Sequence, residues 1–260
     1  MKIYDLSITL DMDVPTEPAF NMPKIIYQKH EDTTAIVAKL CGMGDDWTID
    51  DIPNGMGYAN EKYECGAHSN THMDAPWHYA PTMNGGEKAW TIEDVPLEWC
   101  FGPGVVLDFS DKPDGYIITA ADVEAEFDRI GCEMKPGTIV LVRSGAEYAY
   151  GTTEYFNSGA GFSAEATAWL CERGMRLCGT DGWGWDIPFK YQAENWAKDH
   201  DKSKIWQGHL EGMNYAYCHL EKLYNLKQLP SSGFTVYAFP CKVKGGSAGW
   251  CRVVAMSDED

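Results

Sequence analysis

Three of the seven histidines in this 260-residue chain fall within the run HSNTHMDAPWH, residues 68–78, together with one aspartate. His68, His72, Asp74 and His78 are separated by four, two and four positions. Side chains alternate along an extended backbone, so this spacing places all four on one side of it. Imidazole nitrogen with carboxylate oxygen suits zinc, manganese or iron better than calcium or magnesium, which prefer oxygen ligands. We therefore predict that His68, His72 and Asp74 bind Mn²⁺ or Zn²⁺, as one ion or two; the alternative is a polar turn whose histidines bind no metal.

The same run resembles the signature H-x-G-T-H-x-D-x-P-x-H of the cyclase superfamily of metal-dependent hydrolases, which includes bacterial kynurenine formamidases and isatin hydrolases. Asn70 stands where glycine is usual in that signature. Asparagine tolerates a positive φ better than most residues, so the backbone can keep the same shape. The resemblance extends from DLS at residues 5–7 to SAGW at residues 247–250. It implies a single α/β domain over residues 1–260, of the swivelling β/β/α type with a mixed sheet and flanking helices, that forms a homo-oligomer (a dimer or a tetramer).

A second histidine and carboxylate, His209 and Glu221, stand twelve residues apart. The spacing alone carries little information, but the resemblance implies that both are further metal ligands, because the formamidases place a histidine and a glutamate at this distance in this region. Asp74 would then bridge if two ions bind. His219 is the rival of His209, which we favour because of its match with Glu221. The formamidases continue with Asn-Leu after the glutamate, so Lys222 indicates a different branch of the family.

A divalent ion with an open coordination position brings the pKa of bound water from about 15.7 to about 7 and polarises a carbonyl group. Such a site hydrolyses an amide or an ester without a serine nucleophile. His78 is not needed to complete the ligand set, and the resemblance implies that it carries the proton of the water to the leaving group. The alternatives for His78 are a further metal ligand or a partner of a ligand.

The ligand set and the resemblance together predict a hydrolase that opens a small, aromatic cyclic amide, similar to isatin hydrolase. An arylformamidase or an enol-lactone hydrolase is the alternative. The formamidases usually carry a tryptophan before a Pro-Gly near the N-terminus, whereas residues 14–18 read VPTEP here, which argues against N-formylkynurenine as the substrate. Two other classes remain open: a lyase or cyclase that stabilises an enolate without consuming water, and a non-catalytic metal-binding protein.

Two tryptophans stand among glycines in the run GTDGWGWD, residues 179–186, a pattern typical of an exposed turn. Aromatic side chains in such a turn are suited to stacking on a flat ring. The alternative is that each ring holds its loop against the core. The same alternative applies to Phe20, which stands in a proline-rich segment. The candidate substrate-binding residues are Phe20, Trp77, Trp183 and Trp185.

The sequence allows two roles for each of three polar residues near these runs. Asp181 and Asp186 either orient a ligand histidine or cap the following turn. Cys65, three positions before His68, is either a soft ligand or nucleophile or a small core residue. We favour the core, because no second thiol accompanies it.

The composition excludes several classes of partner. A formal net charge of −18 repels nucleic acid and anionic lipid, which leaves a small-molecule substrate as the expected partner. The first five residues lack the apolar run of a signal peptide or membrane span. Nine cysteines at irregular spacing include no C-x-x-C pair, so we predict no disulfide framework and a cytoplasmic location.

Strand and helix patterns alternate in the middle of the chain, which predicts parallel strands with helical crossovers. Capping residues Thr119 and Ser163 mark the starts of the two helices. Ligands gather at the carboxyl ends of such strands, where the residue 179–186 run begins. The predicted strands are 2–10, 104–109, 139–143, 175–178, 234–239 and 250–255; the predicted helices run to Ile130 and Glu172; and residues 42–57 are predicted to be a surface loop.

Overall fold

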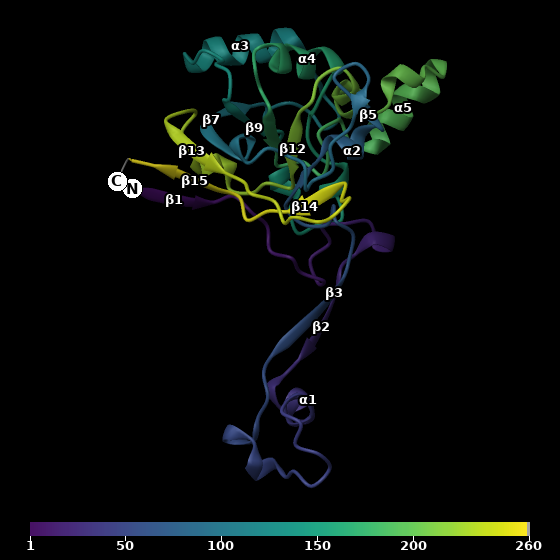
Figure 1. Cartoon of the computed structure of the whole chain (residues 1–260). Coiled ribbons are helices and arrows are strands. Elements are labelled where there is room, and N and C mark those ends of the chain that lie inside the picture. Colours follow the sequence, from purple (N-terminus) through teal and green to yellow (C-terminus); the bar gives the residue numbers. More distant parts are fainter. Residues whose placement is uncertain (259–260) are drawn as a thin grey trace.

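A mixed β-sheet forms the centre of the protein (Figure 1). The computed structural model describes residues 1–258, and in this part of the chain nine strands pair in the order β1-β15-β13-β7-β9-β11-β12-β4-β14. The strands are β1 (Lys2–Asp5), β4 (His72–Asp74), β7 (Phe101–Asp108), β9 (Ile139–Arg143), β11 (Leu177–Thr180), β12 (Cys218–Glu221), β13 (Phe234–Tyr237), β14 (Ala248–Trp250) and β15 (Val254–Ser257). The predicted α/β architecture with a mixed sheet and flanking helices is confirmed.

The parallel centre of the sheet follows the predicted alternation. Strands β7, β9, β11 and β12 are parallel neighbours, and α3 (Ala120–Ile130) and α4 (Ala164–Glu172) cross over between the first three. Thr119 caps α3 in a capping box with Asp122, and the Ser163 hydroxyl accepts a hydrogen bond from the Ala166 amide at the start of α4. Both predicted caps are therefore confirmed.

Side chains of the central strands alternate between two buried faces. Val105 and Leu107 pack toward α3 and α4, which cover one face of the sheet in Figure 1, whereas Val106 packs on the opposite face against a second cluster. That second cluster includes Ile92 from a turn and Leu226 from a short 3₁₀ helix. A sheet that is buried on both faces requires continuous apolar strands, which the central strands provide.

The predicted strands 2–10 and 250–255 depart most from the structure, whereas 104–109, 175–178 and 234–239 differ from β7, β11 and β13 by up to three residues at an end. Strand β1 ends at Asp5, because beyond it the Ile8 amide donates to the Thr71 hydroxyl instead of to a strand neighbour. The predicted strand 250–255 is divided between β14 and β15, which lie at different places in the sheet. The segment is apolar apart from Arg252, but its backbone bonds go to two different sets of partners.

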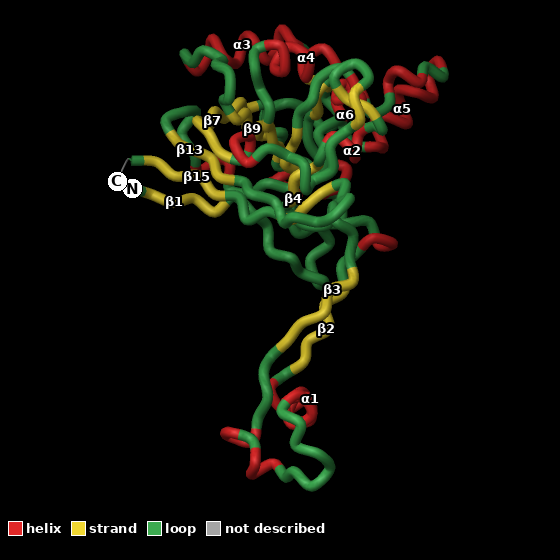
Figure 2. Tube along the Cα trace, in the orientation of Figure 1, coloured by secondary structure: helices red, strands yellow, loops and turns green. Residues whose placement is uncertain are grey.

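An arm that no local sequence pattern predicted extends from the body (Figures 1 and 2). Its stem is an antiparallel hairpin of β2 (Lys24–Gln28) and β3 (Asn60–Glu64), and its far end carries α1 (Thr34–Leu40). The predicted loop 42–57 lies in this far end and contains two short 3₁₀ turns.

The remaining elements are short, except for α5. They are the paired strands β5 (Thr82–Met83) and β6 (Glu87–Lys88), the parallel pair β8 (Ile117–Ile118) and β10 (Gly161–Phe162), and the helices α2 (Pro76–Tyr79), α5 (Phe189–Asp199) and α6 (Gln207–Leu210). All nine cysteines are free, as predicted. Among residues 1–258, the helices are too short or too polar to cross a bilayer.

Candidate metal centre

Two neighbouring antiparallel strands, β4 and β12, build the floor of the site. Their register sets His219 opposite Asp74 and Glu221 opposite His72. Residues two apart on a strand share a face, and residues directly opposite each other have adjacent side chains. Strand alternation and register therefore bring two histidines and two carboxylates together, and all four are buried.

Three further histidines reach this floor from outside the strands. His68 precedes β4 in a turn, His78 lies on α2, and His209 lies on α6. The predicted extended backbone holds only for residues 72–74. Asn70 has a φ of 65°, the left-handed conformation that its side chain tolerates, and Pro76 occupies the first turn of α2, where proline favours a helix.

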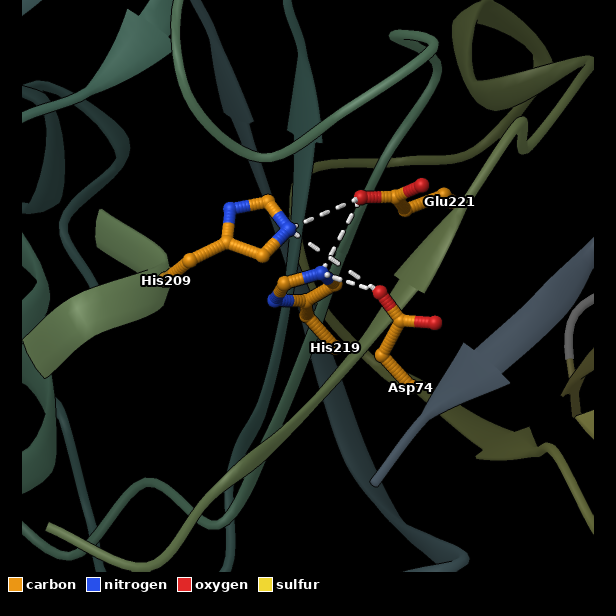
Figure 3. A group of neighbouring side chains, drawn as sticks. All are labelled: Asp74, His209, His219 and Glu221. Atoms are coloured by element: carbon orange, nitrogen blue, oxygen red, sulfur yellow. Dashed lines mark hydrogen bonds and ion pairs between the residues drawn. The ribbon is translucent and has the colours of Figure 1, made fainter. Parts of the chain in front are cut away.

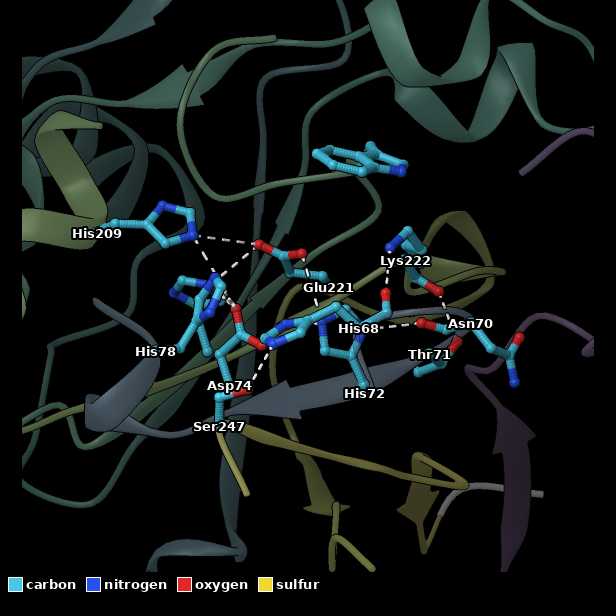
Figure 4. A network of polar contacts seen from close by, with 12 residues as sticks. His68, Asn70, Thr71, His72, Asp74, His78, His209, Glu221, Lys222 and Ser247 are labelled. Atoms are coloured by element: carbon cyan, nitrogen blue, oxygen red, sulfur yellow. Dashed lines mark hydrogen bonds and ion pairs between the residues drawn. The ribbon is translucent and has the colours of Figure 1, made fainter. Parts of the chain in front are cut away.

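One oxygen of each carboxylate faces the first group of histidines (Figure 4). Asp74 Oδ1 lies 2.8 Å from His68 Nδ1 and 3.1 Å from His72 Nε2. Glu221 Oε2 lies 3.5 Å from the same nitrogen of His72. Among the buried polar atoms of residues 1–258, Asp74 Oδ1 and His72 Nε2 have no hydrogen-bond partner.

The other oxygen of each carboxylate faces a second group (Figure 3). His219 Nε2 lies 3.0 Å from both Asp74 Oδ2 and Glu221 Oε1. His209 Nε2 lies 4.0 Å and 3.7 Å from these two oxygens, and His78 Nε2 lies 3.7 Å from Asp74 Oδ2. One potential ligand atom from each of Asp74, His209, His219 and Glu221 falls within 4.8 Å of the others.

The donor set fits a divalent metal ion. Two buried carboxylates with acceptor oxygens on both sides require positive charge, since an unpaired buried charge is costly. Imidazole nitrogens beside them complete the mixed nitrogen and oxygen set that zinc and manganese take. Because the carboxylates each offer an oxygen to both groups of histidines, potential ligand atoms lie on both sides of Asp74.

Each of three histidines has its second ring nitrogen held by the protein. His72 Nδ1 lies 2.8 Å from the Asn70 carbonyl oxygen, and His68 Nε2 lies 2.9 Å from the Ser247 hydroxyl. His209 Nδ1 bonds to the Asp186 carboxylate. Such bonds fix the orientation of the ring and leave the other nitrogen free to bind a metal.

Asp186 takes the first of the two roles that the sequence left open, because it orients a histidine, and it bonds amides at the start of α6 instead of capping the turn that follows it. Its carboxylate bonds the ring of His209 and also accepts from the Gly208 amide, 2.7 Å away, and the His209 amide, 3.2 Å away. Asp181 is used differently: it accepts from the amides of Ser144 and Glu147, away from the histidines.

Replacing Asp186 by asparagine is expected to weaken metal binding by about 10- to 100-fold, the usual effect of losing a carboxylate that orients a ligand histidine. The measurement is a competition titration against a coloured chelator. Asp122→Asn, which changes a capping carboxylate on α3, is the control and should bind metal as the wild type does. Unchanged affinity in Asp186→Asn would show that His209 is not a ligand or needs no orientation.

Buried charges of opposite sign meet at the floor and shift one another's pKa values. Burial by itself raises the pKa of both carboxyl groups, but the surrounding histidines outweigh it. They hold the pKa of Asp74 well below its usual value and lower the pKa of Glu221 to about 2. Burial alone lowers the pKa of His219, but its hydrogen bonds to the two carboxylates outweigh this effect and raise it to about 9. Without a metal, the proton on His219 therefore supplies part of the positive charge that the carboxylates require.

Metal affinity is expected to rise with pH between 6 and 8, by up to about tenfold per unit for each proton displaced. Below its pKa of about 9, His219 holds a proton on the ring that must leave before Nε2 binds an ion. Chelator competition at pH 6, 7 and 8 measures the slope. In His219→Gln the slope should be smaller; an equal slope would show that His219 does not exchange its proton for the ion.

His78 differs from the floor histidines. Burial is the main cause that lowers its pKa to about 4, so its imidazole is neutral at pH 7. A neutral imidazole has a nitrogen that can accept a proton, but a pKa of about 4 makes it a weak base at pH 7 that gives the proton up readily, so the pKa favours the second half of the predicted shuttle over the first. Its ring stands beside that of His68, with centroids 4.0 Å apart.

A cavity of about 110 Å³ adjoins these histidines. Trp206 forms part of its wall and stacks on His209, with ring centroids 4.7 Å apart and planes 4° apart. Trp183 and Phe189 contact each other edge to face, 5.9 Å apart. The lining residues are His68, His78, Trp183, Gly184, Asp186, Ile187, Phe189, Gln192, Trp206, His209, Glu221 and Lys222.

Of the four candidate substrate-binding residues, the structure brings Trp183 to the cavity. Trp185 is buried beneath the site, where its Nε1 donates to the Thr167 hydroxyl and its ring stacks on Phe162. Phe20 is 93 % exposed and Trp77 is 42 % exposed, and both lie outside the cavity lining in the described chain.

Three ring-bearing residues of the site were not assigned to it from the sequence. His219 was set aside as a rival of His209, but the fold brings both to the floor, because His219 precedes Glu221 by two positions on the same strand. That two-residue spacing was the available signal. Trp206 and Phe189 had no signal, since nothing in the chain near them marks a pocket wall.

Comparison with known proteins identifies the family and the fold of this chain. The model of the family named Cyclase matches residues 4–187, more than half of the chain. The chain therefore belongs to the cyclase family. It is 27 % identical over 188 residues, 72 % of each chain, to the kynurenine formamidase of Erythrobacter litoralis.

Solved structures of the same fold include two isatin hydrolases. An isatin hydrolase bound to the product analogue thioisatinate superposes with a TM-score of 0.73 at 21 % identity, over 98 % of this chain and 91 % of that chain. Isatin hydrolase A from Labrenzia aggregata, bound to benzyl benzoate, gives 0.73 at 24 % identity, over 99 % and 94 % of the two chains. At these identities the comparison establishes the fold.

Proposed function

We propose that this protein is a metal-dependent hydrolase that opens a small aromatic cyclic amide. The observation that carries the proposal is the arrangement of Asp74 and Glu221, each with one oxygen toward either group of buried histidines, beside a cavity with aromatic walls. His68, His72, Asp74, His209, His219 and Glu221 would hold the metal. A bound divalent ion supplies Lewis-acid activation of water and of the substrate carbonyl.

The protein residues then perform three tasks. His78, neutral at pH 7, accepts a proton at Nε2 and returns it to the leaving nitrogen. Trp183 and Trp206 hold a flat ring against the cavity wall. Burial of the floor excludes bulk water, which strengthens each electrostatic contact there.

The cavity size supports a small substrate. Ligand pockets commonly measure about 300–1,000 Å³, whereas this cavity measures about 110 Å³. A compact bicyclic lactam such as isatin requires less expansion of this space than N-formylkynurenine, with its amino-acid side chain. The similarity to isatin hydrolases and to a kynurenine formamidase supports hydrolysis of a carbon–nitrogen bond.

The test is a side-by-side assay of isatin, N-formylkynurenine and an enol-lactone with the Mn²⁺- or Zn²⁺-loaded protein and with the metal-free protein. We expect isatin to be hydrolysed fastest and EDTA to abolish the activity. Mass spectrometry of the product should show the addition of one water, which a lyase or cyclase does not consume. Faster hydrolysis of N-formylkynurenine or of the enol-lactone would assign that substrate class in place of the cyclic amide. Inactivity on all three would overturn the proposed function.

The quaternary and cellular assignments are part of the same proposal. We propose a homo-oligomer in the cytoplasm, which contains one or two Mn²⁺ or Zn²⁺ ions per chain. The arm supports association, because a two-stranded hairpin is marginally stable alone and its far end exposes Leu40, Ile49 and Met56. Light scattering of the purified protein measures the mass of the assembly, and anomalous scattering at metal edges identifies the ion.

A further inference from the structure

A buried lysine stands next to the floor of the site. Lys222 directly follows Glu221, is 1 % exposed and lines the cavity. Its backbone has a φ of 59°, a conformation that costs energy for a long L-residue. The surroundings enforce it: the Lys222 amide donates to the Gly182 carbonyl at 2.9 Å, and its carbonyl accepts from the Thr71 hydroxyl at 2.6 Å.

The ammonium group of Lys222 has three neighbours. Nζ donates to the His68 carbonyl oxygen, 2.6 Å away, a bond drawn in Figure 4. It lies 3.0 Å from Glu17 Oε1 and 4.8 Å from the centre of the Trp183 ring. The positive charge of Lys222 therefore lies at the cavity wall, next to the backbone of His68, a candidate metal ligand.

Glu17 comes from the proline-rich segment near the N-terminus and is also buried. Its Oε2 accepts from Trp183 Nε1 at 3.0 Å and from Asn21 Nδ2 at 3.3 Å. Glu17, Lys222 and Trp183 thus form a closed triangle in which each side chain contacts the other two. Lys222 and Trp183 face the cavity, whereas Glu17 stands outside its lining.

The contact between Glu17 and Lys222 changes the charge that the cavity wall presents to a ligand. A lone ammonium on the wall of a small, dry cavity would attract an anionic ligand, because opposite charges interact strongly where water is excluded. The Glu17 carboxylate, which contacts the ammonium and lies outside the cavity lining, cancels that charge. The remaining surface at this end of the cavity is the indole of Trp183, which suits an uncharged flat ring.

We propose that Glu17 is a specificity-determining residue, which neutralises Lys222 so that the cavity takes uncharged aromatic substrates in preference to aromatic carboxylates. The inference deepens the proposed function, and rests on it for the assignment of this cavity as the substrate site. It concerns binding and is tested without turnover.

The test compares benzoate with benzamide, two probes of the same shape that differ in charge, by calorimetric titration of protein loaded to equal metal content. In Glu17→Gln, the amide oxygen still accepts from the Trp183 indole, but the compensating charge is gone. We expect the ratio of benzoate affinity to benzamide affinity to rise by about tenfold. This increase corresponds to only part of the Coulomb attraction between a carboxylate and a nearby unpaired ammonium. Any direct bond of benzoate to the metal is common to all variants and cancels in the comparison.

Two further variants give the inference its controls. In Glu17→Gln/Lys222→Met the ammonium is also absent, so the ratio should return to within about twofold of the wild type, since no net charge remains. In Lys222→Met alone the unpaired Glu17 carboxylate should lower the ratio below that of the wild type. Circular dichroism verifies folding of each protein.

An unchanged ratio in Glu17→Gln, or a raised ratio that persists in the double variant, overturns the proposal. If Glu17→Gln does not fold, Lys222→Met becomes the test. A ratio of benzoate to benzamide affinity at or above the wild-type value in that variant overturns the proposal. Failure of the proposed hydrolysis leaves these binding ratios unaffected, so the two outcomes are distinguished.

Discussion

The variant His72→Ala is expected to lose its bound metal and, with it, the whole of the hydrolytic activity, falling to the level of the EDTA-treated protein. His72 is fully buried, and its Nε2 faces Asp74 Oδ1 at 3.1 Å and Glu221 Oε2 at 3.5 Å. Alanine leaves these oxygens without the nitrogen that shares the cation with them, and an incomplete chelate binds far more weakly. Elemental analysis after dialysis measures the metal content.

The matched control for this experiment is His200→Ala, which removes a histidine that follows α5, away from the site. It should retain both the ion and the activity. A stoichiometric ion in His72→Ala would remove this residue from the ligand set. The same analysis of His68→Ala and Asp74→Asn tests whether these three residues are needed together.

The variant His78→Asn is expected to keep its metal but to lose about 10²- to 10⁴-fold in turnover, the usual contribution of a general acid–base group. His78 Nε2 lies 3.7 Å from Asp74 Oδ2, farther than the floor histidine His219, and its imidazole is neutral at pH 7. Steady-state kinetics with isatin measure the loss, and elemental analysis of the same sample measures the ion.

Three results separate the roles of His78. Retained metal with lowered turnover supports the shuttle. Loss of metal would make His78 a ligand, in line with its place beside His68 and Asp74 among the potential ligand groups. Near-normal turnover would exclude it from the mechanism.

Several features of the fold follow from local sequence alone. The helix starts at Thr119 and Ser163 depend on bonds between residues three apart, so short-range patterns predict them. The central strands 139–143 and 104–109 are apolar on both faces, a composition that a sheet covered on both sides requires. The ends of the sheet were predicted poorly, because hydrogen bonds of residues 6–10 and 250–255 go to partners far along the chain.

The sequence by itself determined the kind of chemistry, because the residues 68–78 carry enough imidazole and carboxylate groups in a short run to indicate a metal site. Only the tertiary structure decided how that site is completed. His219 joins Asp74 because β12 pairs with β4 in one register, and a shift by one residue would turn its ring to the other face of the sheet. Likewise, Glu17 meets Lys222 across 205 positions of the chain, a contact that no local pattern encodes, since it depends on where the N-terminal segment packs.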